Sequence, residues 1–562
     1  MNDFPQPTSR RSFLHAASMA GAGLWASQAA CQTESDPGAE HGGALPSSPF
    51  DCVVVGGTPG GIAAAVTAAR MGRSVALVEE NAHLGGMSAS GLGKSDIENR
   101  AAIRGFFAEF VERVHRHYLE KYGPDSDNVR LCREGYYYEP SVAEATFDRM
   151  VEEQPSISLL KSHRFQSTLT REGTACGVVV EDRETGVQKR LAARLVIDAT
   201  YEGDAYASAG ARYRLGRESR DEFGEPHAGV IYYDYRKRVF LPGSTGEGDR
   251  RLPAYTYRLC LTTDPSNAHP LSEPPPDYDR SPYLGYFEDL KEGRLAGPKR
   301  FKPGRGYYPA HFNTLVRALS VSEIPNRKTD VNMNPRPLGF PFAEENQGYV
   351  EGNHEVRREI RTGIRNLTLG LLWFLQQDPE APATHRRIAG RYHLPLDEFT
   401  DNGHFPFQLY IREARRLVGL RTLTELDVSR NQARPGAGRF EDAVAVGEFP
   451  VDSFPVRKRR PGDTAVLEGY LYMLENTRPY QIPYRIMIPE SVDGLIVPVA
   501  ASTSHVAYSS IRTEPTWMAL GQAAGVAAHL ALEQDLQPRH VPVGGLQDIL
   551  RRQGQVLDLE FS

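Results

Sequence analysis

Two short apolar runs near the start of the chain predict neighbouring strands of a buried parallel sheet. Residues 51–55 read Asp-Cys-Val-Val-Val, and residues 74–78 read Ser-Val-Ala-Leu-Val. Continuous apolar runs of this length are typical of parallel strands that are covered on both faces. Between them, residues 62–70 are mostly alanine, and Gly72 follows, as expected for a helix that ends at a glycine. This order predicts a strand–helix–strand unit.

Similar apolar runs occur much later in the chain and predict further strands and a long helix. Residues 195–200 and 494–499 each form such a run. Residues 516–533 are predicted to form a helix, because Pro515 suits its first turn and small and apolar residues follow. The strand-like and helix-like patterns together predict an α/β protein.

The middle of the chain gives weaker patterns. Residues 229–241 alternate apolar and polar positions, as a solvent-facing strand would. Residues 264–310 are rich in proline, glycine and tyrosine, which predicts irregular structure. Residues 349–377 carry apolar side chains at helical spacing and predict an amphipathic helix. Residues 408–420, which are rich in arginine, are predicted to form a second helix in this region.

A glycine-rich turn joins the first strand to the first helix, and it is suited to binding a diphosphate. The turn consists of Gly56, Gly57, Thr58, Pro59, Gly60 and Gly61. Backbone N–H groups and the positive end of a helix dipole bind phosphate oxygens, and glycine lets the chain approach them closely. Glu79 ends the second strand about 20 residues later, where a carboxylate accepts hydrogen bonds from ribose hydroxyls. Thr58 replaces the middle glycine of the usual G-x-G-x-x-G pattern, but its surroundings support the same interpretation.

Two further segments indicate FAD rather than NAD. Gly85, Gly86 and Met87 follow Glu79 closely, and they resemble a segment of FAD-binding oxidoreductases of the glutathione-reductase and fumarate-reductase type. A later segment resembles the Ala-Thr-Gly segment of those flavoproteins, with Tyr201 in place of the glycine; it consists of Asp198, Ala199 and Thr200. The resemblance implies that both segments bind FAD.

The C-terminal segment 500–515 carries the family resemblance, together with residues 201–204 and 409–416. These segments are similar to the bacterial FAD-dependent oxidoreductase family, some members of which are labelled xanthan lyase. The resemblance implies a Rossmann-like FAD-binding domain of the two-dinucleotide-binding-domain type, with an inserted α+β substrate domain. It also implies that the N-terminus of the helix 516–533 lies near the flavin, and that the residues before it contact the cofactor, namely Ser509, Ser510 and Ile511.

A chain of 562 residues is too long for one core and suggests two or three domains. The resemblance implies a discontinuous FAD-binding domain formed by three segments, 49–112, 150–225 and 484–535. The remaining segments are a leader and linker (1–48), a helical insertion (113–149), a substrate or cap domain (226–483) and a C-terminal tail (536–562).

The first residues of the chain predict export. Residues 9–14 read Ser-Arg-Arg-Ser-Phe-Leu and precede a stretch rich in alanine and glycine, which resembles a twin-arginine signal. The twin-arginine translocation machinery carries folded proteins, so we expect a location in the periplasm or cell envelope, with no integral membrane span after processing. Cys31 follows a degenerate lipoprotein box and is a candidate for lipidation.

Charge and cysteine spacing exclude some classes of function. A formal net charge of −6 argues against a nucleic-acid partner, and the basic run 457–460 is predicted to be a solvated loop. None of the five cysteines forms a C-x-x-C pair, so no zinc or iron–sulfur site is expected. Cys52 lies in an apolar run and is predicted to be a core residue.

Four residues are candidates for catalysis. His505 follows a predicted strand, in a loop expected to open toward the flavin, and histidine suits a general base near neutral pH. Arg512 precedes the last long helix and is suited to a flavin anion or a substrate oxygen, or to an ion pair with Glu514. His404 is a second proton-transfer candidate. Arg412 is a candidate for binding a carboxylate or a sugar hydroxyl, with a surface salt bridge as the alternative.

The leading hypothesis for function is dehydrogenation of an alcohol, amine or carbohydrate-like small molecule by hydride transfer to flavin N5, with an unidentified electron acceptor. A reductase of an activated double bond is the second hypothesis, and it would need an arginine clamp for a substrate carboxylate. Two alternatives are not redox enzymes: a polysaccharide lyase, and a carbohydrate-binding protein that keeps a flavoprotein fold. The sequence does not identify the substrate.

Overall fold

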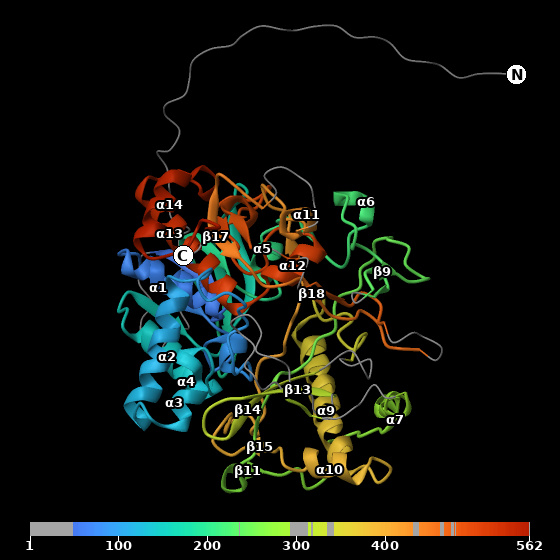
Figure 1. Ribbon diagram of the computed structural model, residues 1–562. Helices are drawn as coiled ribbons and strands as arrows, with labels where there is room; N and C mark the ends of the chain where they lie inside the picture. Colours follow the sequence, from blue (N-terminus) through green and yellow to red (C-terminus); the bar gives the residue numbers. More distant parts are fainter. Residues whose placement is uncertain are drawn as a thin grey trace, which may run out of the picture.

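The computed structural model (Figure 1) describes most of the chain from Pro49 onward. The described residues are 49–234, 237–292, 313–315, 318–333, 342–430, 438–460, 466–473, 477 and 479–560. The predicted export signal and Cys31 lie outside them.

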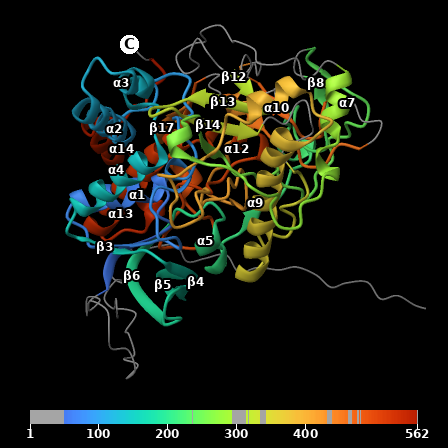
Figure 2. The ribbon, with the colours of Figure 1, turned by 90° about the horizontal axis from the view of Figure 1, so that it is seen from below.

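A seven-stranded sheet forms the core of the first region, and its centre is parallel. Its hydrogen-bonded order is β3-β2-β1-β6-β5-β4, and β21 pairs with the end of β6. The pairs β1–β2, β2–β3, β1–β6 and β6–β21 are parallel, whereas β4, β5 and β6 form an antiparallel ladder (Figure 2). The bounds are β1 Phe50–Val55, β2 Val75–Val78, β3 Ile157–Leu160, β4 His163–Arg171, β5 Thr174–Asp182, β6 Gln188–Asp198 and β21 Leu495–Ile496. The predicted α/β class with a Rossmann-like parallel core is confirmed.

Two helices far apart in sequence pack together beside this sheet. Helix α1 (Pro59–Arg70) lies along α13 (Glu514–Glu533), and both are almost entirely buried. A Cβ atom at Gly521 would lie 2.0 Å from the Gly60 carbonyl oxygen, so the two backbones approach more closely than any side chain would allow. Pro515 lies in the first turn of α13, as predicted.

Further helices pack around this pair. Helix α2 (Phe106–Tyr122) contacts both α13 and α4 (Pro140–Glu152), and α14 (Val543–Arg552) contacts α13. The remaining helices of this region are short: α3 Asp127–Cys132, α5 Asp204–Ser208, α6 Arg220–Phe223, α11 Glu425–Val428 and α12 His505–Ile511. Within the described residues, none of the helices has the length and apolarity that crossing a membrane requires.

A second region contains an antiparallel sheet and a long helix, in the lower part of Figure 1. The sheet has the order β10-β14-β13-β12, with bounds β10 Leu259–Thr262, β12 Asn313–Leu315, β13 Leu319–Glu323 and β14 Lys328–Met333. Helix α9 (His354–Gln377) begins at Asn353, whose side chain caps the first turn, and it packs against α10 (Ala383–Ala389). The amphipathic helix predicted here is present, five residues shorter at its start.

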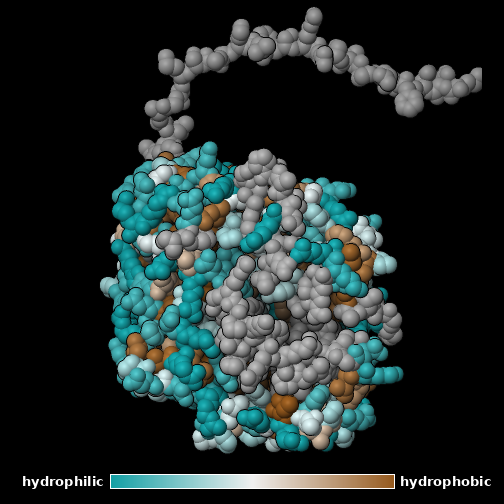
Figure 3. All heavy atoms as spheres, viewed as in Figure 1, coloured by the Kyte–Doolittle hydropathy of each residue, from teal (hydrophilic) through white to brown (hydrophobic). Residues whose placement is uncertain are grey.

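Short strand pairs and one short helix complete the described elements. They are α7 Gly285–Lys291, β7 Tyr213–Arg214 with β16 Arg416–Leu417, β8 Tyr233–Asp234 with β9 Val239–Phe240, β11 Ala268–His269 with β15 Leu394–Pro395, β17 Ala443–Gly447 with β20 Tyr480–Pro483, and β18 Asp452–Ser453 with β19 Leu471–Tyr472. Residues 229–241 thus contain a hairpin rather than one strand. Among the residues that Figure 3 colours by hydropathy, most are hydrophilic, and the apolar ones form small separate groups.

The helix predicted over residues 408–420 is wrong. Tyr410 is bridged to Thr256, and Arg416 and Leu417 form β16, so the segment is extended and irregular. Its arginines Arg412, Arg415 and Arg416 are buried instead of lying on a solvated helix face, and the last two bond to carboxylates of other segments. Tertiary pairing therefore decides the backbone here, against the helical preference of the residues.

Candidate dinucleotide and redox site

A cleft lies at the carboxyl ends of β1, β2 and β6, where parallel sheets of this type bind ligands. Its volume is about 70 Å³, and it is open to solvent. The predicted Gly56, Thr58, Glu79 and Thr200 all line it. Helix α9 of the second region forms the opposite wall through His354, Arg357 and Arg361.

Thr58 explains the departure from the usual glycine pattern. Its side-chain oxygen accepts a hydrogen bond from the Gly61 N–H (3.1 Å), which caps α1, and donates one to the Ala199 carbonyl (2.9 Å), which ties the turn to β6. Within the described part of the chain, the N–H groups of Thr58 and Gly60 have no acceptor. Such N–H groups at a helix start are suited to a phosphate.

Glu79 is held at the end of β2 by the neighbouring backbone. Its carboxylate accepts hydrogen bonds from the N–H of Gly57 (2.7 Å) and from the backbone and side chain of Asn81 (both 2.8 Å). Burial raises the pKa of Glu79 to about 7. The carboxyl group therefore faces the cleft in one fixed orientation, where ribose hydroxyls would reach it.

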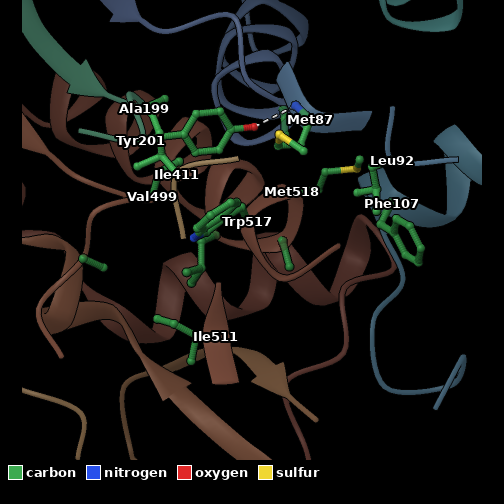
Figure 4. Packing of buried hydrophobic residues seen from close by; sticks show 14 of the residues in the cluster. Met87, Leu92, Phe107, Ala199, Tyr201, Ile411, Val499, Ile511, Trp517 and Met518 are labelled. Atoms are coloured by element: carbon green, nitrogen blue, oxygen red, sulfur yellow. Dashed lines mark hydrogen bonds between the residues drawn. The ribbon is translucent and has the colours of Figure 1, made fainter. Parts of the chain in front are cut away.

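The double glycine, Gly85 and Gly86, leads from the turn to Tyr201. From the sequence, no role is predicted for the side chain of this tyrosine. The Gly85 N–H donates to the Gly57 carbonyl (2.8 Å), and Gly86 begins a short 3₁₀ turn. The Met87 N–H donates to the hydroxyl of Tyr201 (3.0 Å), as Figure 4 shows. Tyr201, which stands in place of the usual glycine, therefore accepts a hydrogen bond from a backbone N–H next to the dinucleotide turn.

Asp198 shapes the turn after β6 instead of presenting its oxygens to the cleft. It accepts hydrogen bonds from the N–H and hydroxyl of Thr200 (3.0 and 2.7 Å) and from the N–H of Tyr206 (2.8 Å). Burial raises its pKa to about 6. Asp198 therefore orders this turn. The Ala199 backbone is bonded to Val55 and Thr58, whereas Thr200 lines the cleft, so a contact of Ala199 with FAD stays a prediction.

The side chains of Ser509, Ser510 and Ile511 are all buried in the protein. The hydroxyl of Ser509 donates to the Val506 carbonyl (2.7 Å), and that of Ser510 donates to the Phe449 carbonyl (2.6 Å). Ile511 is fully buried and belongs to the apolar cluster in Figure 4. A contact between these residues and FAD would have to come from their backbone, so it stays a prediction.

The expectation that His505 lies in an open loop is wrong. His505 is the first residue of α12 and is 2% exposed. Its Nδ1 lies 2.7 Å from a carboxylate oxygen of Glu413, and its Nε2 lies 3.3 Å from the Ser453 hydroxyl. Both ring nitrogens therefore have protein partners, which leaves no nitrogen for a substrate proton. The sequence could not show this, because Glu413 and Ser453 come from distant segments.

His404 contacts a different set of residues from the other catalytic candidates. Its ring packs 4.9 Å from that of His269, on β11, and its Nδ1 lies 3.3 Å from the Glu398 carbonyl. Among the described residues, no interaction joins it to Arg412, Arg512 or the dinucleotide turn. We therefore assign no proton transfer to His404.

Arg512 is buried, and its partners differ from those expected. It donates to the Tyr410 hydroxyl (3.0 Å) and to the Asp452 carbonyl (2.6 Å), and its guanidinium lies 3.8 Å from the Asp452 carboxylate. It makes no ion pair with Glu514, which lies two residues further along the chain. Arg512 thus links the start of α13 to the segment that contains Tyr410.

Arg412 is buried rather than part of a surface salt bridge. Its guanidinium lies between the rings of Tyr410 and Phe454, 4.2 and 3.7 Å from their centres, and it donates to the Ala254 carbonyl (2.9 Å). Within the described residues, its Nε and Nη2 atoms have no hydrogen-bond partner. Burial lowers the pKa of this arginine to about 9.

Glu514 is a candidate for proton transfer that the sequence reasoning missed. It is the first residue of α13, it is 4% exposed, and its Oε1 accepts a hydrogen bond from the Tyr201 hydroxyl (2.7 Å). Its second oxygen, Oε2, has no hydrogen-bond partner in the part of the chain that the structure describes. Burial raises the pKa of Glu514 to about 8. An acidic residue directly before Pro515, at the start of a helix expected near the flavin, was the available signal.

Comparison with known proteins identifies the family. Residues 51–550 match the family model described as FAD dependent oxidoreductase. The chain belongs to this family. FAD is therefore the cofactor of this FAD-dependent oxidoreductase, which the sequence predicted from the turn and the double glycine. A search of curated proteins found no match.

Three solved flavoprotein and related structures illustrate how distant its known relatives are. The myxobacterial chondrochloren halogenase CndH is 12% identical, with 90% of this chain and 80% of that chain covered and a TM-score of 0.35. Glycerol-3-phosphate dehydrogenase from Bacillus halodurans, complexed with FAD, is 14% identical, with 54% and 51% covered and a TM-score of 0.25. THI4 from Thermovibrio ammonificans is 18% identical, with 30% and 67% covered and a TM-score of 0.22. This chain spans only about half of the dehydrogenase, and none of these likenesses bears on its substrate.

The residues at the cleft fit FAD. The unpaired N–H groups of Thr58 and Gly60 would hold the diphosphate, and Glu79 would accept from the adenosine ribose. Tyr201 joins the Met87 backbone, beside this turn, to Glu514 at the start of α13. FAD, when bound, supplies the group that accepts or delivers a hydride.

Proposed function

We propose that this FAD-dependent oxidoreductase dehydrogenates a small polar alcohol or amine, and that Glu514 takes the hydroxyl or amine proton while flavin N5 accepts the hydride. One observation carries the proposal: a buried carboxyl group at the positive end of α13 has one oxygen fixed by Tyr201 and the other without a partner. A pKa of about 8 suits proton transfer near neutral pH. The Tyr201 hydroxyl orients the carboxyl group, because it is itself fixed by the Met87 N–H.

Anaerobic reduction of the flavin tests this function. The FAD-loaded protein is mixed with alcohols, amines and sugars, and loss of the oxidised-flavin absorbance is followed. A Glu514→Gln variant should keep its FAD and be reduced roughly 100-fold or more slowly by the same substrate. Unchanged reduction of this variant would remove Glu514 from the mechanism, and no reduction of the wild-type protein by any member of the three classes would remove the proposed function.

Reduction of an activated double bond is a second candidate, and one observation favours it. With a pKa of about 8, Glu514 is mostly protonated at neutral pH and is ready to donate a proton. The two directions have opposite pH dependence. Dehydrogenation should speed up as pH rises through about 8, because the base must be ionised, whereas double-bond reduction should slow down over the same range. Single-turnover rates measured on both sides of this pH decide between them.

We also propose export of the folded, FAD-loaded protein to the periplasm or cell envelope by the twin-arginine machinery. The residues Arg10 and Arg11 and the small residues after them support this route. Replacing both arginines by lysine should retain the protein in the cytoplasm, which fractionation of expressing cells would measure. Unchanged export of the double variant would contradict the route.

A further inference from the structure

Arg412 is unusual among the buried arginines of this protein. It is 1% exposed, yet its single hydrogen bond runs from Nη1 to a backbone carbonyl. Arg416 is buried to the same degree, but it bonds to the Glu218 carboxylate and to two carbonyls. A buried cation without an anionic partner is costly, because it has lost its hydration without compensation. Among the described residues, Arg412 therefore has no carboxylate within hydrogen-bonding distance.

The two unpaired nitrogens of Arg412 form one edge of the guanidinium. Nε–H and Nη2–H point to the same side and match the two oxygens of a carboxylate. Another arginine of this protein binds a carboxylate through the same edge. The Nε and Nη2 of Arg258 donate to the two carboxylate oxygens of Asp330, at 2.6 and 2.9 Å. The free edge of Arg412 is thus a carboxylate-binding group without its carboxylate.

Arg412 is connected to the redox site through direct contacts. The Arg412 guanidinium stacks on the Tyr410 ring, and the Tyr410 hydroxyl accepts a hydrogen bond from Arg512. Arg512 lies two residues before Glu514, whose carboxyl group is bonded to Tyr201 beside the dinucleotide turn. Besides burial, the charges of Arg512 and Arg258 lower the pKa of Arg412, whereas Tyr410 and the Asp452 carboxylate raise it without a hydrogen bond to the guanidinium.

A neighbouring polar group also lacks a partner. Among the described residues, the buried Thr256 hydroxyl has no hydrogen-bond partner, and the Thr256 backbone is bridged to Tyr410, the residue on which Arg412 stacks. Buried polar groups are usually paired, so this hydroxyl is open to a partner from a ligand.

We propose that the Nε–Nη2 edge of Arg412 binds the carboxylate of the substrate, so that the substrate is an organic acid that carries its reacting alcohol or amine near that carboxylate. The reacting alcohol or amine in this inference rests on the proposed function. The carboxylate does not, because it is inferred from Arg412. It accounts for an arginine that remains unpaired in the protein alone.

The test is calorimetric titration of the FAD-loaded, oxidised protein with malonate and with its neutral analogue malonamide. Malonate should bind and malonamide should not. Arg412→Gln should weaken malonate binding at least about 30-fold, and Arg412→Lys should recover only part of the loss, because lysine lacks the two-pronged edge. Arg358→Gln, on the exposed face of α9, is the matched control and should bind malonate like the wild type.

Several results would overturn the proposal. Equal binding of malonate and malonamide to the wild-type protein, or no malonate binding, would do so even if Arg412→Gln does not fold. Unchanged malonate affinity in Arg412→Gln together with weaker FAD retention would instead assign Arg412 to the flavin. A failure of alcohols and amines to reduce the flavin would remove the proposed function, whereas the malonate titration does not depend on turnover.

Discussion

At the scale of single residues, the site is organised by polar groups that hold one another in the protein interior. Thr58 caps α1 and binds the end of β6, while Tyr201 joins the Met87 backbone to Glu514. Buried polar groups are stable only when they are paired. Arg412, Thr256 and Glu514 are among the described residues with a buried polar atom that has no hydrogen-bond partner, and we propose that a ligand pairs with Arg412 and Glu514.

Tyr201→Phe should destabilise the protein, because it leaves the Met87 N–H without an acceptor and one Glu514 oxygen without a donor. The expected loss is about 1–3 kcal/mol for each buried group that is left unpaired. Urea unfolding followed by circular dichroism measures it. Tyr278→Phe is the control, since the structure shows no hydrogen bond from this half-buried hydroxyl, and it should change stability by less than about 0.5 kcal/mol.

Glu514→Gln should remove a pH-dependent contribution to stability. Burial, with a smaller effect of Asp96, raises the pKa of the folded carboxyl group to about 8 from an ordinary 4.5. The contribution of Glu514 to stability is therefore fully present below about pH 4.5 and is lost as pH rises through about 8. The unfolding free energy of the variant should rise relative to the wild type over this range. Urea unfolding of both proteins at about pH 5, 7 and 9 measures the difference, and a difference that is constant with pH would contradict the assigned pKa.

At the scale of elements, the packing of α1 on α13 places the redox end of the site against the dinucleotide turn. Both helices carry glycine and alanine at the contact, and Gly521 meets the Gly60 carbonyl. The start of α13, with Glu514, is therefore held in a fixed position relative to the turn that precedes α1. This close approach explains the small residues that the sequence shows in both helices.

Gly521→Ala should separate the two helices, because its Cβ would lie 2.0 Å from a backbone oxygen that has no room to move. The expected loss is about 3 kcal/mol or more, with weaker FAD retention. Gly544→Ala in α14 is the matched control, because a Cβ there meets nothing within 4 Å. It should leave FAD content unchanged and stabilise the helix by roughly 0.5–1 kcal/mol. Thermal unfolding and the ratio of flavin to protein absorbance measure both effects.

The elements that could be predicted from the sequence are those whose signal is local. The first strand–helix–strand unit and the helix with Pro515 follow from apolar runs and from proline and glycine at helix ends. The segment 408–420 and the surroundings of His505 could not be predicted, because distant chain segments supply their partners. Tyr201 and Glu514 were visible as residue types, but only their hydrogen bond, over a separation of 313 residues, gives them a role.

At the scale of the whole molecule, the cofactor cleft joins two regions. Its floor is the edge of the parallel sheet, and its opposite wall is the start of α9, where Arg357 binds Asp204 and Arg361 lies near Glu80. A cofactor seated there contacts both regions at once. Binding should therefore stabilise the second region as well as the first.

Addition of FAD at 100 times its dissociation constant should stabilise the FAD-free protein by about 2.7 kcal/mol. Hydrogen exchange should slow in residues 56–61 and also in residues 354–361 of α9. Glu79→Ala should reduce both effects at the same FAD concentration, because the ribose loses its acceptor. Protection limited to residues 56–61 would contradict a cleft closed by α9.

The late position of β21 and α13 in the chain has a consequence during synthesis. Strand β6 gains its neighbour β21, and α1 gains its covering helix, only after residues 495–533 have left the ribosome. Until then the apolar surface of α1 is exposed on the nascent chain, and exposed apolar surface favours aggregation or chaperone binding. The core formed by α1 and α13 is therefore complete only after nearly the whole protein has been translated.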